Sequence, residues 1–361
     1  MKGITLEQIS SRAPGEVAGK FTDFLGETYY RIGNYDAMPP FFMTIVSASD
    51  IWNYIWSNGG LTAGRKHCDQ AVFPYYTADK VSDGRTYTGS FTAIQVKTQD
   101  GTYHWEPFSE AANGLWSIER NLYKNHSGSK VYFEEVNNDL GLTFQYGWTS
   151  SDAYGLVRHS RIINNSGTEQ TVTVLDGCRN ILPSCVTADF QNNNSVLLDA
   201  YKRTDLDEDS GMAVFSITSI VSDKAEPSEG LLANIGWFSC EGDITLSPDA
   251  PDDFRKGKAL NRDIVLKGQR PAYLIKRILA LSPRGGTDSW YQVFDTSLEA
   301  GKIAEIKRKL KNRSVVLKDL ENDIQKGVEQ LISYIATADG LQNTADTETC
   351  IHHEANVLFN I

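Results

Sequence analysis

The amino-acid sequence predicts a mainly β protein in which two large antiparallel sheets stack as a sandwich and are followed by helices. From Phe91 onward, short runs of alternating apolar and polar residues are separated by turn residues. The segment Tyr154–Gly177 contains two such runs around an Asn/Ser/Gly cluster. After Asp295 the apolar residues recur at spacings of three and four. Strands without intervening helices indicate antiparallel sheets, and the later spacing indicates an amphipathic helix.

The segment Tyr154–Gly177 is predicted to form a β-hairpin. Residues 156–163 and 171–175 alternate as strands do, and residues 164–167 (Asn-Asn-Ser-Gly) separate them. Two β-rich runs around such a cluster are typical of a hairpin. Because an isolated hairpin is marginally stable, the chain on both sides is expected to supply further strands and a covering layer.

Strand candidates follow one another through the body of the chain. They are residues 41–48, 91–97, 102–106, 114–122, 129–136, 141–148, 154–164, 169–176, 195–203, 211–221, 231–240, 262–267 and 272–282. Residues 1–38 show little periodicity, and residues 52–76 form an aromatic-dense region around the segment Gly59–His67, which is predicted to be a loop. So many strands exceed an immunoglobulin-sized sandwich, which favours two large stacked sheets.

The pattern changes from strand to helix after Asp295. Residues 296–299 (Thr-Ser-Leu-Glu) fit a capping box, in which the Thr and Glu side chains satisfy each other's backbone amides. The apolar residues that follow are Ile303, Ile306, Leu310, Leu317, Leu320, Ile324, Val328, Leu331 and Ile335. This stripe predicts a helical linker that packs against protein, with a break near residues 312–314 and an end near Gly340.

The chain is strongly acidic. It holds 35 Lys and Arg against 46 Asp and Glu, which gives a formal net charge of −11. Binding to nucleic acid or to an anionic membrane needs a basic surface, so neither partner is expected. No apolar run approaches the roughly 20 residues of a membrane span, and the opening residues lack the apolar core of a signal peptide. A cytoplasmic location is therefore expected.

The sequence lacks the common motifs of metal and nucleotide chemistry. Its five cysteines are scattered and include no Cys-x-x-Cys pair, so free thiols are expected. The patterns of phosphate loops, dinucleotide folds, zincins and hydrolase elbows are absent from the sequence. Neither a metal site nor an organic cofactor is expected.

The adjacent carboxylates Glu134 and Glu135 invite an interpretation as an acid/base pair. Both fall in a predicted strand, where neighbouring side chains point to opposite faces. The two carboxylates are therefore not expected to share one site, and no catalytic residue is assigned.

The candidate binding residues are Arg65, Lys66 and His67. They end the glycine-rich segment Gly59–His67 inside the aromatic-dense region. Aromatic faces stack on sugar rings and arginine binds phosphate through two hydrogen bonds, so this loop is a candidate contact for a sugar or phosphate. A solvated surface loop would have the same composition.

Three segments together resemble the glycoside phosphorylases related to cellobiose and chitobiose phosphorylase. They are the segment Tyr154–Gly177, the run GGLTAGRKH at residues 59–67, and the tail HHEANVLFNI at residues 352–361 after the linker helices. The tail is the most specific of them. The large relatives that act on β-1,3-glucan oligosaccharides look closest.

The resemblance implies a particular architecture and chemistry. An N-terminal β-supersandwich of the galactose-mutarotase-like kind would span residues 1–295, a helical linker 296–340, and the start of an (α/α)6-barrel 341–361. In this family the barrel carries the catalytic Asp, and inorganic phosphate attacks the anomeric carbon with inversion. No residue of this chain corresponds to that Asp, so the resemblance implies a part that binds oligosaccharide and assembles as a homodimer but is inactive alone. A loop of this domain can reach a neighbouring subunit's active site, which gives Arg65 and Lys66 an accessory role.

Two alternatives stay open. The first is a stand-alone carbohydrate-binding or scaffold module without catalytic activity. The second is an aldose-epimerase-like enzyme on a similar sandwich, which would need a His/Glu pair in a cleft that the sequence alone does not identify.

Overall fold

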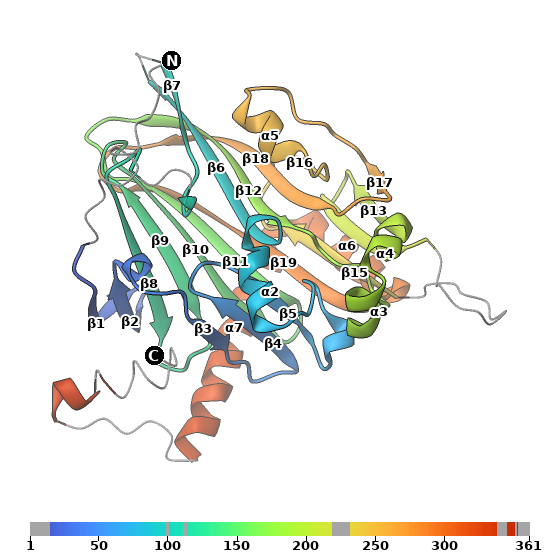
Figure 1. The fold of residues 1–361 in the computed structure, drawn as a ribbon, viewed down its shortest axis with the longest axis horizontal. Helices are drawn as coiled ribbons and strands as arrows, with labels where there is room; N and C mark the ends of the chain where they lie inside the picture. The colour runs from blue at the N-terminus through green and yellow to red at the C-terminus, as the bar shows by residue number, and fades with distance from the viewer. Residues whose placement is uncertain are drawn as a thin grey trace.

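The computed structural model describes residues 15–98, 101–110, 114–218, 232–337, 345–350 and 352. Its body is a sandwich of an 11-stranded and a 5-stranded sheet, accompanied by a small 3-stranded sheet (Figure 1). Every described strand pairing is antiparallel. The predicted fold class, a mainly β sandwich of large antiparallel sheets followed by helices, is confirmed.

The strands, numbered in chain order as in Figure 1, lie in a different order within each sheet. In spatial order, the large sheet contains β1 (Ala18–Phe24), β2 (Glu27–Gly33), β8 (Ile118–Asn125), β9 (Val131–Asn137), β10 (Leu142–Ser151), β11 (Gly155–Asn164), β19 (Gly286–Glu299), β15 (Leu232–Phe238), β14 (Met212–Ile217), β13 (Lys202–Asp207) and β17 (Val265–Lys267). The second sheet contains β16 (Asp243–Thr245), β18 (Ala272–Leu281), β12 (Gln170–Arg179), β6 (Gly89–Thr98) and β7 (Gly101–Trp105). The small sheet contains β3 (Phe42–Ile45), β4 (Ile51–Trp56) and β5 (Leu61–Arg65).

Short helices connect the strands, and longer ones follow them. The helical elements are η1 (Tyr35–Ala37), η2 (Cys68–Gln70), α2 (Ala78–Asp83), η3 (Gly84–Thr86), α3 (Ala188–Asn193), α4 (Ser195–Tyr201), α5 (Ala250–Arg255), α6 (Ala300–Lys309), η5 (Leu310–Asn312) and α7 (Arg313–Thr337). None of the helices in the described part of the chain is long and apolar enough to cross a membrane.

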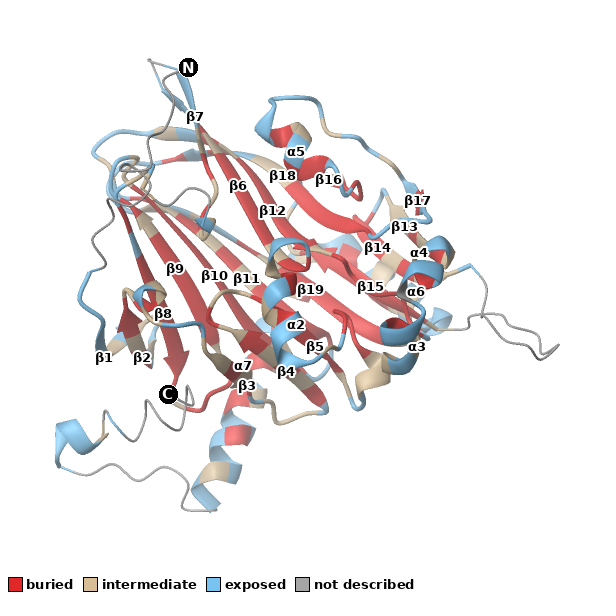
Figure 2. Ribbon diagram, viewed as in Figure 1, coloured by how far each residue is buried: buried red, intermediate tan, exposed pale blue. Residues whose placement is uncertain are grey.

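The main core lies between the stacked sheets. Its largest members are Trp105, Trp148, Trp290, Phe133 and Phe144, all at most 1% exposed. Figure 2 shows buried residues following the strands, whereas the short helices and the loops carry most of the exposed ones. The alternation of apolar residues that predicted the strands therefore also supplies the interior of the sandwich.

The predicted hairpin does not form, because β11 and β12 belong to different sheets. β11 pairs with β10 and β19, whereas β12 pairs with β6 and β18. The chain crosses between the sheets at residues 165–169. The Asn164 amide donates to the backbone oxygens of Thr168 (2.8 Å), Leu281 (3.0 Å) and Ser282 (3.1 Å), which stabilises the crossing. The two strands thus face each other across the core instead of sharing an edge.

The capping-box prediction is wrong. Thr296 and Glu299 lie in β19, a strand of 14 residues that the sequence analysis missed between residues 286 and 295. Helix α6 begins only at Ala300, and the side chain of its N-cap residue, Glu299, makes no capping hydrogen bond. β11 pairs with β19 up to Phe294, and β15 pairs with it as far as Glu299 across an irregularity at Ser297, where φ is 59°. Tertiary pairing therefore overrides the local capping signal.

Other boundaries also differ from the predictions. Residues 195–201 form helix α4 and not a strand, while β1 and β2 form a hairpin in the segment that shows little periodicity. The aromatic-dense region contains β5 and most of β4 of the three-stranded sheet, so residues 61–65 are strand β5 instead of a loop. The predicted start of a barrel at residues 341–361 lies largely outside the described residues.

The linker stripe packs on the outer face of the large sheet, as predicted. Ile306, Leu310, Leu320 and Ile324 are buried there against residues of β11, β14, β15 and β19. The spacing predicted that Leu317 would be buried. In the structure Val316 is buried instead, and Leu317 is half-buried. The reason is the 3₁₀ turn η5, which advances the chain at three residues per turn and shifts the phase of the stripe. The last turn of α7 carries exposed residues and extends beyond the sheets (Figure 1).

Candidate binding cleft

A cleft of about 560 Å³ opens between the two sheets. Strands β8, β9 and β10 of the large sheet line one wall, and β6 and β12 of the second sheet line the other. The loop of residues 106–110 and the helices η1, η3 and α5 border it. Its volume lies within the roughly 300–1,000 Å³ of small-molecule sites.

Aromatic rings line part of the cleft. Phe133 and Tyr146 stack with their centroids 4.9 Å apart and their planes at 11°. Phe108 stands edge-on to Tyr146, at 5.1 Å and 86°. Phe108 has a φ of 66°, a left-handed conformation that is uncommon for a residue with a side chain. A 2.7 Å hydrogen bond from its backbone N–H to the Glu135 carboxylate stabilises this turn, so the fold holds the Phe108 ring in the cleft.

A buried ion pair supports this wall. The Arg120 guanidinium donates through Nε to Glu135 at 2.7 Å, and both side chains are almost fully buried. Glu135 also accepts from the indole of Trp105 at 2.7 Å. Glu134 lies on the opposite face of β9 and accepts from Asn121, Tyr123 and Gln145. The prediction that the two carboxylates do not share a site is confirmed.

The carboxylates that line the cleft are also paired with arginines. Arg85 contacts both oxygens of Glu110, at 3.1 and 3.0 Å. Arg120 contacts Asp36 at 3.5 Å. Arg255 binds Glu106 through two nitrogens, at 2.5 and 2.9 Å.

Glu106 also bonds to His104, whose Nε2 lies 2.7 Å from the carboxylate. Partial burial raises the pKa of Glu106, but the hydrogen bonds from Arg255 and His104 outweigh that effect and bring the pKa down to about 2. A carboxylate so strongly held as an anion is a poor proton acceptor at neutral pH. Glu106 therefore does not act as a free carboxylate base in this pair.

Arg179 differs from the other arginines of the cleft. It lies at the end of β12, and its guanidinium lies over the ring of Phe91 at 4.7 Å. Arg255 approaches the same ring at 5.7 Å. Among the described residues Arg179 makes neither a side-chain hydrogen bond nor an ion pair, and its Nε is buried without a partner.

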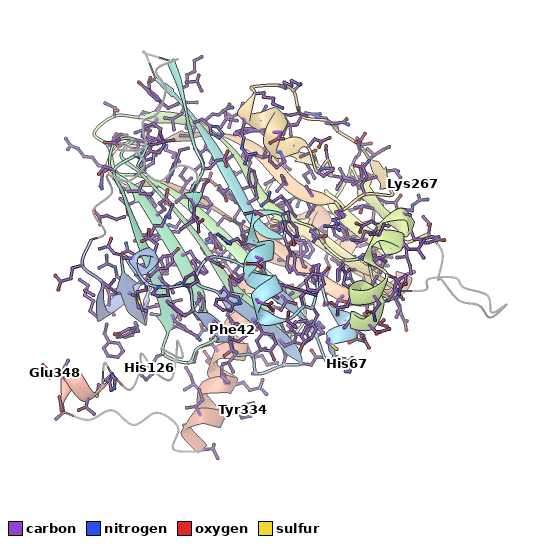
Figure 3. All side chains as sticks on the ribbon, in the orientation of Figure 1. Phe42, His67, His126, Lys267, Tyr334 and Glu348 are labelled. Carbon is purple, nitrogen blue, oxygen red and sulfur yellow. The ribbon has the colours of Figure 1, made fainter. Side chains whose placement is uncertain are left out.

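The predicted binding residues lie elsewhere, on β5 and the turn that follows it. Arg65 donates to Asp295 (2.7 Å), to Asp50 (2.7 Å) and to the backbone oxygen of Asp152 (2.6 Å). Lys66 and His67 are exposed, and Figure 3 shows His67 at the periphery of the molecule. Only Gly59 of the predicted loop lines the cleft. A substrate contact by Arg65, Lys66 or His67 stays a prediction.

The structure also brings together three possible ligand groups in one exposed turn. One ligand atom each of His67, Cys68 and Asp69 lies within 4.8 Å of the others. The His67 Nδ1 accepts from the Asp69 backbone, and the Asp69 carboxylate accepts from the backbone of Ala188 at 2.6 Å. These bonds account for the geometry of the turn, so we assign no metal to it.

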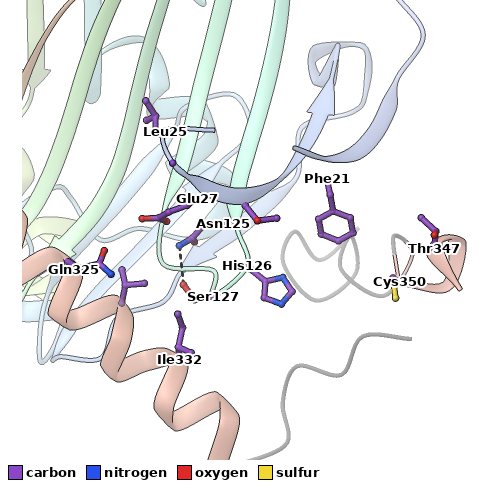
Figure 4. Close-up of a pocket in the computed structure, with 13 residues that line it drawn as sticks. Phe21, Leu25, Glu27, Asn125, His126, Ser127, Gln325, Ile332, Thr347 and Cys350 are labelled. Carbon is purple, nitrogen blue, oxygen red and sulfur yellow. Dashed lines mark hydrogen bonds between the residues drawn. The ribbon is translucent and has the colours of Figure 1, made fainter. Parts of the chain in front are cut away.

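A second hollow, of about 820 Å³, lies between α7 and the turns β1–β2 and β8–β9 (Figure 4). Gln325 and Ile332 of α7 face Leu25 and His126 of the turns across it. Among the described residues that line it, the one carboxylate is that of Glu27, which is paired with Lys130. This hollow has fewer converging polar groups than the cleft, so we place the candidate site in the cleft.

The cleft residues could not be predicted from the sequence because they are far apart in the chain. Arg85, Arg120, Arg179 and Arg255 come from different elements and fit no common motif. The local signal was the run Glu106-Pro107-Phe108-Ser109-Glu110 just after a strand, which carries two charges and an aromatic ring in one loop.

Comparisons with known proteins found similar structures but no similar sequence. No protein-family model matches the chain, and no curated protein matches its sequence. A bacterial glucoamylase complexed with acarbose matches 84% of this chain and 40% of its own, at 8% identity and a TM-score of 0.47. A human-microbiome protein assigned as a kojibiose phosphorylase matches 67% of this chain and 27% of its own, at 8% identity and a TM-score of 0.33. The Slr1438 protein from Synechocystis matches 83% of this chain and 100% of its own, at 9% identity and a TM-score of 0.34.

This chain therefore spans less than half the length of the glucoamylase and of the phosphorylase. With identities below 10% and TM-scores below 0.5, these similarities carry no argument about activity. The proposed function therefore does not rest on these structures.

Proposed function

We propose that this chain binds a saccharide in the cleft and serves as the non-catalytic N-terminal part of an inverting glycoside phosphorylase. The observation that carries the proposal is the pairing of the cleft carboxylates. Asp36, Glu106 and Glu110 each contact an arginine. Among the described lining residues, none offers an unpaired carboxylate for general acid or base catalysis, whereas flat rings and fixed polar groups suit binding.

The cleft chemistry matches the surface of a sugar. An aromatic face such as that of Phe108 packs against the C–H groups of a pyranose ring. Arginine–carboxylate pairs present donors and acceptors in a fixed plane, which suits neighbouring hydroxyl groups. Because each pair is already formed, little side-chain entropy remains to be lost on binding.

The resemblance at the sequence level supplies the rest of the proposal. The catalytic Asp would come from a barrel domain, inorganic phosphate would be the co-substrate, and the assembly would be a homodimer. We therefore expect the purified chain to release no glucose 1-phosphate from laminari- or cello-oligosaccharides in the presence of phosphate. Phosphate-dependent release by this chain would refute the non-catalytic role.

Binding is tested by titration calorimetry with laminaribiose and cellobiose. Phe108→Leu keeps the apolar volume but removes the flat ring, so we expect it to weaken binding roughly fivefold to tenfold, as for the loss of an aromatic contact of about 1 kcal/mol. Tyr103→Leu is the matched control, because Tyr103 is an exposed aromatic residue on the neighbouring strand β7. If neither disaccharide binds, or if both variants lose the same affinity, the cleft is not the saccharide site.

A stand-alone carbohydrate-binding module is the second candidate, and the paired carboxylates favour it equally. The two functions differ in what cleft variants do to phosphorolysis. As part of a phosphorylase, the cleft should change the KM of the complete enzyme for its oligosaccharide when Phe108 is replaced. An unchanged KM together with weakened binding favours the module.

A further inference from the structure

Arg179 is the one arginine of the cleft that has no acceptor among the described residues. The other arginines that line it, Arg85, Arg120 and Arg255, each bind at least one carboxylate. Glu106, a carboxylate whose charge acts on Arg179, is already bonded to Arg255 and His104. The guanidinium of Arg179 therefore keeps its hydrogen-bonding capacity for a group from outside.

This arrangement is costly in the free protein. A buried N–H without an acceptor loses the hydrogen bonds that it makes in water. The Arg179 Nε is such a group. Stacking on Phe91 at 4.7 Å stabilises the positive charge of Arg179. It gives the Nε–H no acceptor, because a cation–π contact is not a hydrogen bond.

The neighbouring cation adds a second cost, which indicates the charge of the missing group. Arg179 and Arg255 lie over the same ring, at 4.7 and 5.7 Å. Burial lowers the pKa of Arg179 and repulsion from Arg255 lowers it further, to about 10, so the group is still charged at neutral pH. A neutral hydroxyl in the cleft would leave this repulsion in place, whereas an anion would relieve it.

We propose that the cleft takes an anionic saccharide, whose phosphate or carboxylate group is bound by Arg179 beside Arg255. The inference rests on the proposed saccharide site and adds the class of its ligand. The planar guanidinium can donate two parallel hydrogen bonds to the oxygens of either group. Sugar phosphates and uronic acids share this chemistry. The sugar ring would lie toward Phe108 and Tyr146, which line the same cleft.

The test is titration calorimetry of the intact chain with glucose 6-phosphate, glucuronic acid, glucose and inorganic phosphate. We expect at least one of the charged sugars to bind roughly tenfold or more tightly than glucose, the factor expected for one charged hydrogen bond. Arg179→Gln should abolish this preference. Arg179→Lys keeps the charge and should retain part of it. The preference should also fall at high salt.

Arg203→Gln is the matched control, because Arg203 lies on strand β13 and pairs with Asp205 outside the cleft. Thermal unfolding shows whether each variant folds, and Arg255→Gln provides a second variant in the cleft. Arg255→Gln should reduce the preference for the charged sugar more weakly than Arg179→Gln.

The outcomes separate this inference from the proposed function. Equal binding of charged and neutral sugars, or a charge preference that survives Arg179→Gln, overturns the anionic ligand and leaves the saccharide site standing. Binding of inorganic phosphate through Arg179 without binding of any sugar overturns the saccharide site, and with it the anionic saccharide as ligand. A preference for glucose 6-phosphate identifies the phosphate ester, and a preference for glucuronic acid identifies the carboxylate.

Discussion

Arg158 and Asp176 form a fully buried, bidentate ion pair that joins the two sheets. The guanidinium of Arg158 on β11 donates to the carboxylate of Asp176 on β12 at 2.7 and 2.8 Å, and neither side chain is exposed. Trp290, Ser160 and Thr92 also donate to Asp176, at 2.9, 2.8 and 2.6 Å. Burial raises the pKa of Asp176, but Arg158 and these hydroxyl donors outweigh it, so the pKa lies below its ordinary value.

Asp176→Asn should strongly destabilise the protein. The substitution leaves the Arg158 charge buried without a counter-ion, a change that costs about 3–5 kcal/mol. Urea denaturation monitored by tryptophan fluorescence measures it. Asp205→Asn breaks the half-exposed pair with Arg203 and should have little effect. If both variants lose the same free energy of unfolding, the buried pair contributes no more to stability than the exposed one.

His159 should make the protein less stable at mildly acidic pH. Burial lowers its pKa, and the positive charges of Arg161, Arg158 and Lys130 lower it further, to about 4. Tyr132 bonds to its Nδ1 at 3.0 Å, and Tyr291 stacks on the ring at 4.5 Å. The unfolded chain takes up the proton near pH 6.5, whereas the folded chain does not until about pH 4.

The unfolded state therefore binds more protons between these values, and stability falls as the pH drops from about 6.5 to about 4, by about 1–3 kcal/mol. His159→Gln should remove this part of the pH dependence in urea denaturation, while His67→Gln, an exposed control, should retain it. If the pH profiles of the parent and His159→Gln are parallel, burial of neutral His159 does not contribute.

Leu320→Ala tests the contact between the linker helix and the sheet. Leu320 is fully buried against the large sheet, so its truncation should cost about 2–5 kcal/mol. Val315→Ala on the same helix is the control, because Val315 is 52% exposed. Chemical denaturation measures both. A small and equal change in the two variants would mean that the helix is not part of the cooperative unit.

Arg65→Ala should reduce stability. Arg65 is the ion-pair partner of the nearly buried Asp295, at 2.7 Å. Burial raises the pKa of Asp295 above its ordinary value even though Arg65 opposes the rise. Loss of the arginine should cost about 1–3 kcal/mol, the range for an unsatisfied buried group. Lys66→Ala changes an exposed neighbour and should leave the denaturation midpoint unaltered.

Arg65→Ala and Lys66→Ala also test the accessory binding role that the family resemblance implies for Arg65 and Lys66. A raised KM of the complete enzyme for sugar or phosphate would support a contact at the rim of an active site. Reduced stability with unchanged KM would make Arg65 purely structural.

The sequence by itself determined the fold class, most strand positions and the helical linker. Alternation with a period of two and turn residues are local properties, so β6, β7, β9, β10, β11, β12 and β18 lie close to the predicted ranges. The apolar spacing of the linker helices is also a local property, so their buried face was predicted. The exception is the phase shift at η5, which buries Val316 instead of Leu317.

Only the tertiary structure decided which strands pair and which side chains meet. The segment Tyr154–Gly177 looks like a hairpin because strand propensity does not encode which strand will be the neighbour. The partners of β11 and β12 come from residues 286–299 and 272–281, far along the chain. Thr296 and Glu299 fit a helix cap, yet both lie in β19, where pairing with β15 extends to Glu299.

The cleft could not be predicted from the sequence for the same reason. Arg179 and Arg255 are distant in the chain and meet over Phe91 only because β12, α5 and β6 come together in the fold. Likewise, nothing in the run Gly59–His67 shows that Arg65 binds Asp295, which lies 230 residues away. Charge and residue type are properties of the sequence, but the partner of each charge depends on long-range packing, and that partner decides whether the charge stabilises the fold or remains available to a ligand.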